Sequence, residues 1–199
     1  CDSKGFAAEY HAIRILFVGT FGRAFDFDLI YEANAIALAE GLSVEWILCG
    51  EGDQLNDVKK SFQGVENVKF PGWVNRSQFA SLAARSDFAL APYRNKSFFD
   101  QSFPNKIVDY LSKSLPIVTS LKGEVRSLLQ RHGLGMTYES STELVAILKQ
   151  HLEQPSQKTI IGARCRSYYL ANLDGHVIYE KLSEHLEKIA SREKPELIK

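Results

Sequence analysis

The sequence predicts an α/β domain built on a parallel β-sheet of about six strands, with helices on both faces. Short apolar runs alternate regularly with amphipathic stretches along residues 13–155. The runs are hydrophobic throughout rather than at every second residue, which is typical of strands buried on both faces of a parallel sheet. Regular alternation of strand and helix favours a doubly wound, Rossmann-like arrangement. In such sheets ligands bind at the carboxyl ends of the strands, so the loops there are the candidate site.

Each element is bounded by turn or capping residues. Apolar, β-branched runs give six expected strands, at 13–19 (IRILFVG), 43–50 (SVEWILCG), 67–74 (NVKFPGWV), 87–92 (DFALAP), 115–120 (LPIVTS) and 134–138 (LGMTY). Apolar residues at helical spacing give expected helices at 26–41, 53–62, 75–86, 104–114, 123–133 and 141–154. We therefore expect a linker at 1–12, an α/β domain at 13–155 and a helical carboxyl-terminal tail at 156–199.

The composition argues against several classes of protein. Of the 199 residues, 45% are hydrophobic, and 24 Lys and Arg balance 24 Asp and Glu, so the chain has no overall field for nucleic acid. Three cysteines are too few for a disulfide framework or a zinc site, which predicts a reducing, cytoplasmic location. No apolar run approaches the roughly 20 residues of a membrane helix. The opening residues lack Met and read as a linker, which suggests a piece of a longer protein.

The loop after the first strand, GTFGRAFDFD (19–28), combines two glycines with a basic residue. Gly19 and Gly22 permit a sharp turn and a close approach of the backbone to a ligand, and Arg23 has the reach to contact an anion. The loop lacks the G-x-G-x-x-G dinucleotide fingerprint. A plain strand-to-helix turn with a surface arginine remains the alternative. The loop after the second strand, CGEGDQ (49–54), is acidic, so we expect a tight turn with Asp53 as the helix cap rather than a phosphate site.

The loop after the fourth strand, APYRNKSFFDQSF, leads into a helix that begins at Pro104. Loops this long are usually functional in such folds. Proline suits the first turn, and the free N–H groups of Asn105, Lys106 and Ile107 are expected to form an anion site with the helix dipole. Asp109, one turn further, is placed to accept hydrogen bonds from sugar hydroxyls. These features predict a nucleotide site, with a capped helix bearing solvated Lys106 and Asp109 as the alternative.

The order of these stretches resembles a known family. ILFVGTFGRAFDFDLIYEA, WILCGEGDQL, NVKFPGWVNRSQFASLAARSDFALAPY, SFPNKIVDYLSKSLPIVTS and RHGLGMTY are similar, in order and spacing, to the carboxyl-terminal half of retaining GT-B-fold glycosyltransferases of family 4, the glycosyl transferases group 1. The resemblance covers roughly residues 13–150. It implies that residues 13–155 form the nucleotide-sugar-binding half of a GT-B fold, and that a separate amino-terminal domain binds the acceptor.

The resemblance also implies roles for particular residues. The family's usual pair of glutamates, eight residues apart, falls on Gln101 and Asp109, with Ser102, Phe103 and the helix start between them. Asp109 keeps the carboxylate expected to bind ribose, whereas Gln101 departs from the glutamate that contacts the donor sugar. In the first loop, Thr20 stands where the family often has an arginine, so Arg23 and Lys106 are expected to stabilise the leaving diphosphate. The base is expected near Trp73, with Tyr93 and Arg94 alongside.

The implied function is transfer of a sugar from a nucleoside-diphosphate donor to a glycan or lipid-linked acceptor. The Pro-Asn-Lys helix start resembles a branch common in bacterial surface-polysaccharide synthesis, where a full-length enzyme could sit at the inner face of the membrane. No metal or other cofactor is expected, since the nucleotide-sugar is a substrate. This chain alone is expected to bind donor without transferring it. Two alternatives remain: a catalytically inactive, partner-binding module, favoured by Gln101, and an oxidoreductase, disfavoured by the missing fingerprint.

Overall fold

The computed structural model describes residues 12–95, 99 and 102–192. They form a six-stranded sheet in the order β3-β2-β1-β4-β5-β6, and every pairing is parallel. The strands are β1 (Ile13–Val18), β2 (Val44–Cys49), β3 (Val68–Gly72), β4 (Phe88–Ala91), β5 (Ile117–Thr119) and β6 (Gly135–Thr137). The predicted fold class, a Rossmann-like doubly wound sheet of about six strands, is therefore confirmed.

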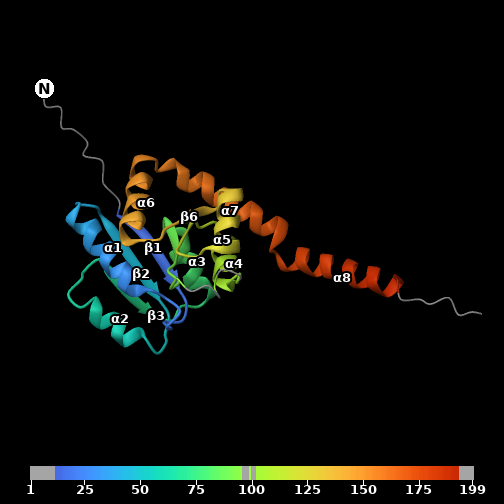
Figure 1. Cartoon of the computed structure of the whole chain (residues 1–199), viewed down its shortest axis with the longest axis horizontal. Coiled ribbons are helices and arrows are strands. Elements are labelled where there is room, and N and C mark those ends of the chain that lie inside the picture. The colour runs from blue at the N-terminus through green and yellow to red at the C-terminus, as the bar shows by residue number, and fades with distance from the viewer. Residues whose placement is uncertain (1–11, 96–98, 100–101, 193–199) are drawn as a thin grey trace, which may run out of the picture.

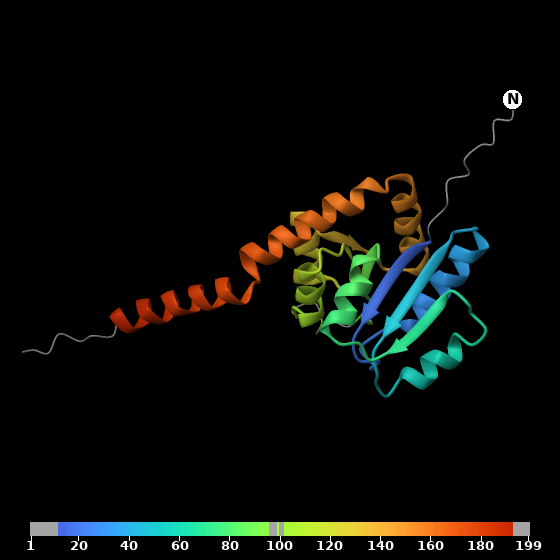
Figure 2. The ribbon, with the colours of Figure 1, turned by 180° about the vertical axis from the view of Figure 1, so that it is seen from behind.

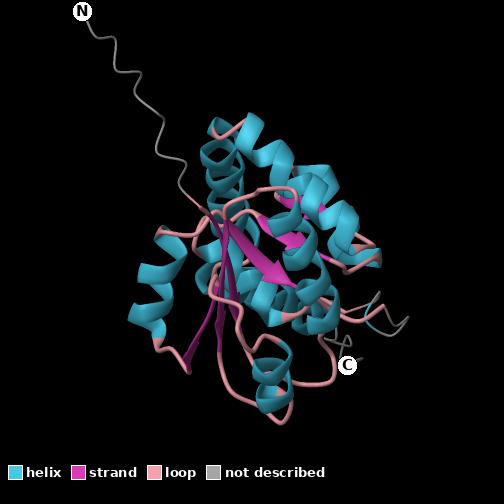
Figure 3. Cartoon of the chain, turned by 90° about the vertical axis from the view of Figure 1, so that its left-hand side faces the viewer, coloured by secondary structure: helices cyan, strands magenta, loops and turns pink. Residues whose placement is uncertain are grey.

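Helices cover both faces of the sheet, as Figure 3 shows. They are α1 (Phe27–Ala39), α2 (Leu55–Ser61), α3 (Arg76–Ala84), α4 (Asn105–Ser112), α5 (Gly123–His132), α6 (Ser141–Glu153), α7 (Ser156–Asn172) and α8 (Gly175–Arg192). On one face α1 packs against α2 and α6, and on the other α3 contacts β1 and α4 packs against α7 (Figures 1 and 2). The sequence placed the strands and helices up to α6 to within a few residues, and it gave α7 and α8 only as a helical tail.

The four inner strands β2, β1, β4 and β5 are mainly buried because both faces of the sheet are covered, whereas the edge strands β3 and β6 are partly exposed. An aromatic cluster extends the core beyond the carboxyl end of β1: Phe17 meets the rings of Phe21, Phe25 and Phe27 at centroid distances of 5.4, 5.2 and 5.1 Å. Asp26 caps α1 by accepting a hydrogen bond from the N–H of Leu29, as its position before the helix indicates. The first loop is therefore folded back onto the domain and has a fixed shape.

The chain changes direction along the sheet between β1 and β4. After β3 at one edge, it returns to the centre and places β4 beside β1. The two strands pair only at Ile15–Phe88 and Leu16–Ala89, so their carboxyl ends are not joined by strand pairing. A reversal of strand order of this kind creates the crevice in which α/β proteins bind ligands.

The tail consists of α7, which packs on α4, and α8, which leaves the domain (Figures 1 and 2). Large apolar side chains are exposed along α8 at Ile178, Tyr179, Leu182, Leu186 and Ile189. The predicted linker at 1–12 lies almost wholly outside the described residues. Within the part of the chain that the structure describes, no helix is long and apolar enough to span a bilayer.

Asp87 ties the tail to the amino-terminal ends of the central strands β1 and β4. Its carboxylate accepts hydrogen bonds from the backbone N–H of Arg14 at 2.8 Å and from Nζ of Lys158 at 3.0 Å, and Nε2 of His151 lies 3.7 Å away. Burial raises the pKa of this carboxyl group, but the bonds from His151, Arg14 and Lys158 outweigh it and lower the pKa to about 2. The charged form is therefore favoured by folding.

We expect Asp87→Asn to destabilise the fold at pH 7 by about 2 kcal/mol. Because the pKa is lower in the folded state, the contribution of the wild-type carboxylate is complete above about pH 4 and is lost as the pH falls toward 2. Urea unfolding between pH 2 and pH 7 measures this, and the variant should lose less stability on acidification. Asp53→Asn is the control, since that exposed side chain lies 3.9 Å from Arg23 and contributes little. Equal pH profiles for wild type and Asp87→Asn would contradict the assignment.

Candidate donor-binding site

The amino terminus of α4 lies over the point where β1 and β4 separate. Pro104 is the N-cap, with φ −66° and ψ 138°, so the helix begins at Asn105, one residue later than predicted. Among the described residues, the N–H groups of Asn105 and Lys106 have no hydrogen-bond acceptor. The N–H of Ile107 donates to the carbonyl of Pro104 at 2.9 Å, so the expectation that it is also free was wrong. Two donors, rather than three, remain for an anion.

Two side chains of α4 replace the missing strand pairing at the end of β1. The hydroxyl of Tyr110 accepts a hydrogen bond from the N–H of Val18 at 3.0 Å and donates one to the carbonyl of Leu90 at 3.1 Å. Nζ of Lys106 donates to the carbonyl of Val18 at 2.8 Å. Lys106 and Tyr110 are four residues apart and so lie on the same face of the helix. Both polar groups of Val18 thus find partners on α4.

The Lys106 ammonium occupies an unusual environment. It lies 3.7 Å from the ring centroid of Phe17 and 4.5 Å from that of Phe25. Burial lowers the pKa of Lys106 to about 7, and the nearby carboxylate of Asp109 opposes that change only in part. A lysine held in this way can gain or lose its proton near neutral pH, and it is not the solvated side chain of the alternative interpretation.

The first loop leaves room for this ammonium. A Cβ atom on Gly19 would lie 2.2 Å from Nζ of Lys106. Thr20 is exposed at the tip of the loop, and Gly22 faces open space. The Arg23 side chain is 86% exposed and lies 3.9 Å from Asp53, away from any contact with α4 among the described residues. Lys106, not Arg23, is therefore the basic group that the fold fixes at this crevice.

The second loop supports the first through backbone contacts. The N–H of Phe21 donates to the carbonyl of Glu51 at 2.7 Å, and the N–H of Gly19 donates to that of Cys49 at 3.0 Å. A Cβ on Gly50 would lie 1.8 Å from the carbonyl oxygen of Gly19. The expected cap at Asp53 is wrong: α2 begins after Gln54, which makes no side-chain capping bond. These glycines serve close packing of two loops.

Trp73 borders the same hollow as the first loop. Its side chain is 67% exposed, just past the end of β3. The shallow hollow is lined by Val18, Gly19, Thr20, Gly50, Glu51, Trp73 and Val74. The structure thus brings Trp73 together with Gly19 and Thr20, and it leaves an aromatic face free for a planar ligand.

Tyr93 and Arg94 are placed differently from what the sequence suggested. The Tyr93 ring is buried against Phe25 and Phe99, at centroid distances of 4.8 and 5.1 Å, and burial raises its pKa to about 12. Arg94 reaches across to Asp26 and Asp28, at 3.7 and 3.4 Å. Tyr93 packs in the core and so presents no free face to a nucleobase, whereas Arg94 is 40% exposed but is paired with two carboxylates.

The remaining predicted residues flank the helix start. The Ser102 hydroxyl donates to the carbonyl of Phe99 at 2.8 Å, and Phe103 is exposed. Gln101 lies outside the described residues. The Asp109 carboxylate has no hydrogen-bond partner among the described residues; its partial burial raises its pKa, which Lys113 and Lys106 oppose. Asp109 is thus one turn from Lys106 with acceptor oxygens available.

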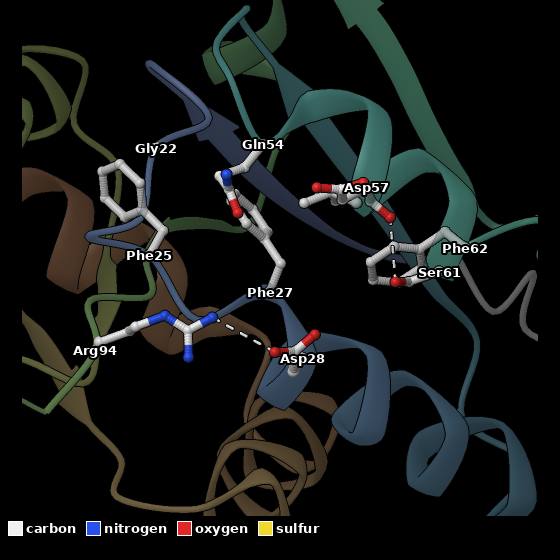
Figure 4. A pocket seen from close by; sticks show the side chains of 10 residues that line it. Gly22, Phe25, Phe27, Asp28, Gln54, Asp57, Ser61, Phe62 and Arg94 are labelled. Atoms are coloured by element: carbon white, nitrogen blue, oxygen red, sulfur yellow. Dashed lines mark hydrogen bonds and ion pairs between the residues drawn. The ribbon is translucent and has the colours of Figure 1, made fainter.

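A second cavity lies on the other side of the first loop, between α1 and α2 (Figure 4). Phenylalanine rings form part of its wall, and the carboxylates of Asp28 and Asp57 line it, with Arg94 paired to Asp28. Like charges repel a phosphate, so this cavity does not suit an anionic ligand. No cluster of three metal-ligating side chains occurs in the described ranges.

The comparison with protein families decides the identity of this domain. The family model described as Glycosyl transferases group 1 matches residues 12–154. The chain belongs to the glycosyl transferases group 1 family. Among curated protein sequences, none shows significant similarity to it.

Solved structures give this group 1 glycosyltransferase chain the fold of one GT-B half. HepE of Anabaena, crystallised with UDP and glucose, is 18% identical, with a TM-score of 0.72 and coverage of 88% of this chain and 48% of that one. WaaG, a glycosyltransferase involved in lipopolysaccharide biosynthesis, is 18% identical, with a TM-score of 0.64 and coverage of 87% and 46%. The catalytic domain of cholesterol-α-glucosyltransferase from Helicobacter pylori is 15% identical, with a TM-score of 0.65 and coverage of 80% and 98%. The chain therefore spans about half the length of the first two.

Tyr110 is the residue that sequence reasoning missed in this glycosyltransferase chain. It directly follows Asp109 in the sequence, and its spacing of four from Lys106 was the available signal. Nothing in the sequence indicated that its hydroxyl would join two strands, because that contact depends on where β1 and β4 separate.

Proposed function

We propose that this chain binds the donor in a retaining glycosyltransferase of family 4, with a nucleoside-diphosphate sugar as the ligand. The observation that carries the proposal is the arrangement at the β1–β4 crevice. There the Lys106 ammonium comes together with the N–H groups of Asn105 and Lys106, which have no acceptor among the described residues, at the start of one helix. Positive charge and oriented donors at a helix start are what a diphosphate requires.

Each neighbouring group has a role in this proposal. Breaking the glycosyl–phosphate bond places negative charge on the diphosphate, and groups fixed in advance around it lower the barrier. Lys106 and the helix start supply that stabilisation, and the exposed Arg23 adds charge from the first loop. Asp109 accepts hydrogen bonds from the ribose hydroxyls, and Trp73 stacks on the base. No step requires a metal ion in this scheme.

The rest of the reaction belongs to a second domain. We propose that an amino-terminal domain binds a glycan or lipid-linked acceptor, and that this chain alone transfers no sugar. The half-length match to HepE and WaaG supports this division. The role of WaaG in lipopolysaccharide biosynthesis supports a place in bacterial surface-polysaccharide synthesis, in the cytoplasm or at the inner face of the membrane.

Calorimetric titration with UDP, GDP, ADP and NAD, without added metal, tests this function. We expect one nucleoside diphosphate to bind and NAD not to bind. Asp109→Ala should weaken that binding roughly tenfold, because the ribose loses a charged hydrogen-bond acceptor. Asp57→Ala is the matched control, since that carboxylate lines the separate acidic cavity.

The titration also separates this function from its rival. If wild type binds none of the nucleotides, the donor-binding role fails, and the catalytically inactive, partner-binding module becomes the better description. The exposed apolar side chains of α8 are the feature that favours that rival. Equal weakening by Asp109→Ala and Asp57→Ala would place the ribose elsewhere.

A further inference from the structure

We propose that Tyr110 is a positioning residue of this site: its hydroxyl fixes Val18 so that the Val18 carbonyl holds the Lys106 ammonium behind Gly19. The importance of that position for ligand binding rests on the proposed function. The control of the Lys106 environment by Tyr110 is a matter of geometry and is independent of the proposed function.

Tyr110 substitutes for strand pairing between the ends of β1 and β4. β1 and β4 pair as far as Leu16 and Ala89 and no further. Two residues on, the N–H of Val18 donates to the Tyr110 hydroxyl at 3.0 Å, and the same hydroxyl donates to the carbonyl of Leu90 at 3.1 Å. The Tyr110 side chain is almost fully buried, so no water replaces these bonds if the hydroxyl is removed.

The backbone of Val18 holds the side-chain ammonium of Lys106 in position. The N–H of Val18 is held by Tyr110 and its carbonyl accepts from Nζ of Lys106 at 2.8 Å. The ammonium then lies over the rings of Phe17 and Phe25, and burial opposes its charge. A lysine is normally drawn to solvent, so a fixed carbonyl is needed to keep it inside.

Gly19 leaves space for the Lys106 ammonium because it has no side chain. A Cβ at this position would lie 2.2 Å from Nζ and 3.2 Å from Cε of Lys106. Any side chain at Gly19 would therefore displace the ammonium from its place behind the loop. Gly19 lines the hollow that Trp73 borders, so this place is at the wall of the proposed donor site.

The proton equilibrium of Lys106 gives a readout that does not depend on a ligand. The titratable groups around it are Asp109 on the same helix and, near Tyr110, the side chains of Tyr93 and Cys49. Burial raises the pKa of Cys49 to about 11 and that of Tyr93 to about 12, so both stay neutral near pH 7. A titration between pH 6 and pH 9 therefore reports on Lys106.

The experiment is an NMR titration of lysine side chains in the free chain, with the Lys106 signal identified by its loss in Lys106→Met. In Tyr110→Phe and in Gly19→Ala we expect the pKa of Lys106 to rise toward that of a solvated lysine. Tyr138→Phe is the matched control: Tyr138 is equally buried, and the side chain nearest its hydroxyl is that of Ser120, not a residue of α4. It should leave the pKa of Lys106 unchanged.

Nucleoside-diphosphate titration of the same variants completes the test. We expect roughly tenfold weaker binding in Tyr110→Phe and no change in Tyr138→Phe. If Tyr110→Phe lowers the melting temperature but leaves both the pKa of Lys106 and the affinity unchanged, the hydroxyl is only structural and the inference is overturned. If wild type binds no nucleotide while the pKa still responds to Tyr110→Phe, the positioning role stands and the proposed ligand is wrong.

Discussion

Lys106→Met is expected to reduce nucleoside-diphosphate affinity by about 10- to 100-fold while leaving the domain at least as stable as wild type. The loss follows from removing a charged hydrogen-bond donor that the fold fixes at the start of α4, which is worth about 1.5–3 kcal/mol. Methionine nearly matches lysine in length and makes favourable contacts with aromatic rings, so the space between Phe17 and Phe25 stays filled.

The stability half of this expectation follows from the sign of the pKa change. The pKa of Lys106 is about 7 in the folded chain, well below the value of 10.5 for a free lysine. At pH 7 and below, the unfolded chain holds this proton more tightly, so charge on Lys106 opposes folding. Between pH 7 and pH 10.5 wild-type stability should therefore rise with pH. Lys106→Met removes that slope and should gain about 1 kcal/mol at pH 7.

Calorimetric titration measures the nucleotide affinity of Lys106→Met, and urea unfolding at pH 7 and pH 9 measures its stability. Lys59→Met is the matched control, since Lys59 lies in the last turn of α2 and its ammonium also lies over a ring, 5.9 Å from the centroid of Phe70. That variant should bind nucleotide as wild type does. Unchanged affinity in Lys106→Met would remove this lysine from the diphosphate site. A large loss of stability would show that its role is structural.

Gly50→Ala is expected to cost about 3 kcal/mol or more of unfolding free energy and to abolish nucleotide binding. Gly50 has φ +134°, and a Cβ there would lie 1.8 Å from the carbonyl oxygen of Gly19. The N–H of Gly50 also donates to the carbonyl of Gly72 at 2.7 Å, so the residue joins the loops after three strands. Relief of the clash must move the Gly19 backbone, and with it the wall of the proposed donor site.

Two other glycines separate the clash from the backbone strain. Gly64 has φ +81° with open space around it, so Gly64→Ala tests strain alone and should cost about 1–2 kcal/mol. Gly22 has no such conformation and nothing within 4 Å, so Gly22→Ala should be close to neutral. Urea unfolding of the three variants gives the comparison. A cost for Gly50→Ala no larger than that for Gly64→Ala would refute the argument from close approach.

The domain retains, at its proposed ligand site, a lysine whose charged form opposes folding. Lys106 is held between aromatic rings by the carbonyl of Val18, against its preference for water. Groups that oppose folding are characteristic of functional sites, where charge must be fixed before the ligand arrives. Asp87 shows the opposite behaviour at the amino-terminal ends of the central strands: its charged form stabilises the fold, and it ties α7 to β1 and β4.

The sequence by itself determined the elements of this protein and their layering. Continuous apolar runs predicted the six strands and their parallel pairing from local pattern, although only the four inner strands are mainly buried. The start of α4 near Pro104 was also predictable, because proline favours the first positions of a helix. So was the cap at Asp26, because side-chain capping depends on residues only three positions apart. The helix-start pattern, and then the family resemblance, indicated Lys106 and Asp109 as candidate donor-binding residues, and these roles remain predictions.

Only the tertiary structure decided where those side chains point. Tyr93 and Lys106 both looked like exposed loop and helix-start residues, but the aromatic cluster beyond β1 buries the first and encloses the ammonium of the second. Gly50 is required by a backbone 31 positions away, at Gly19, and Tyr110 by a gap between two strands that are remote in sequence. Such contacts depend on strand order and loop packing, and these are properties of the whole folded chain rather than of any segment.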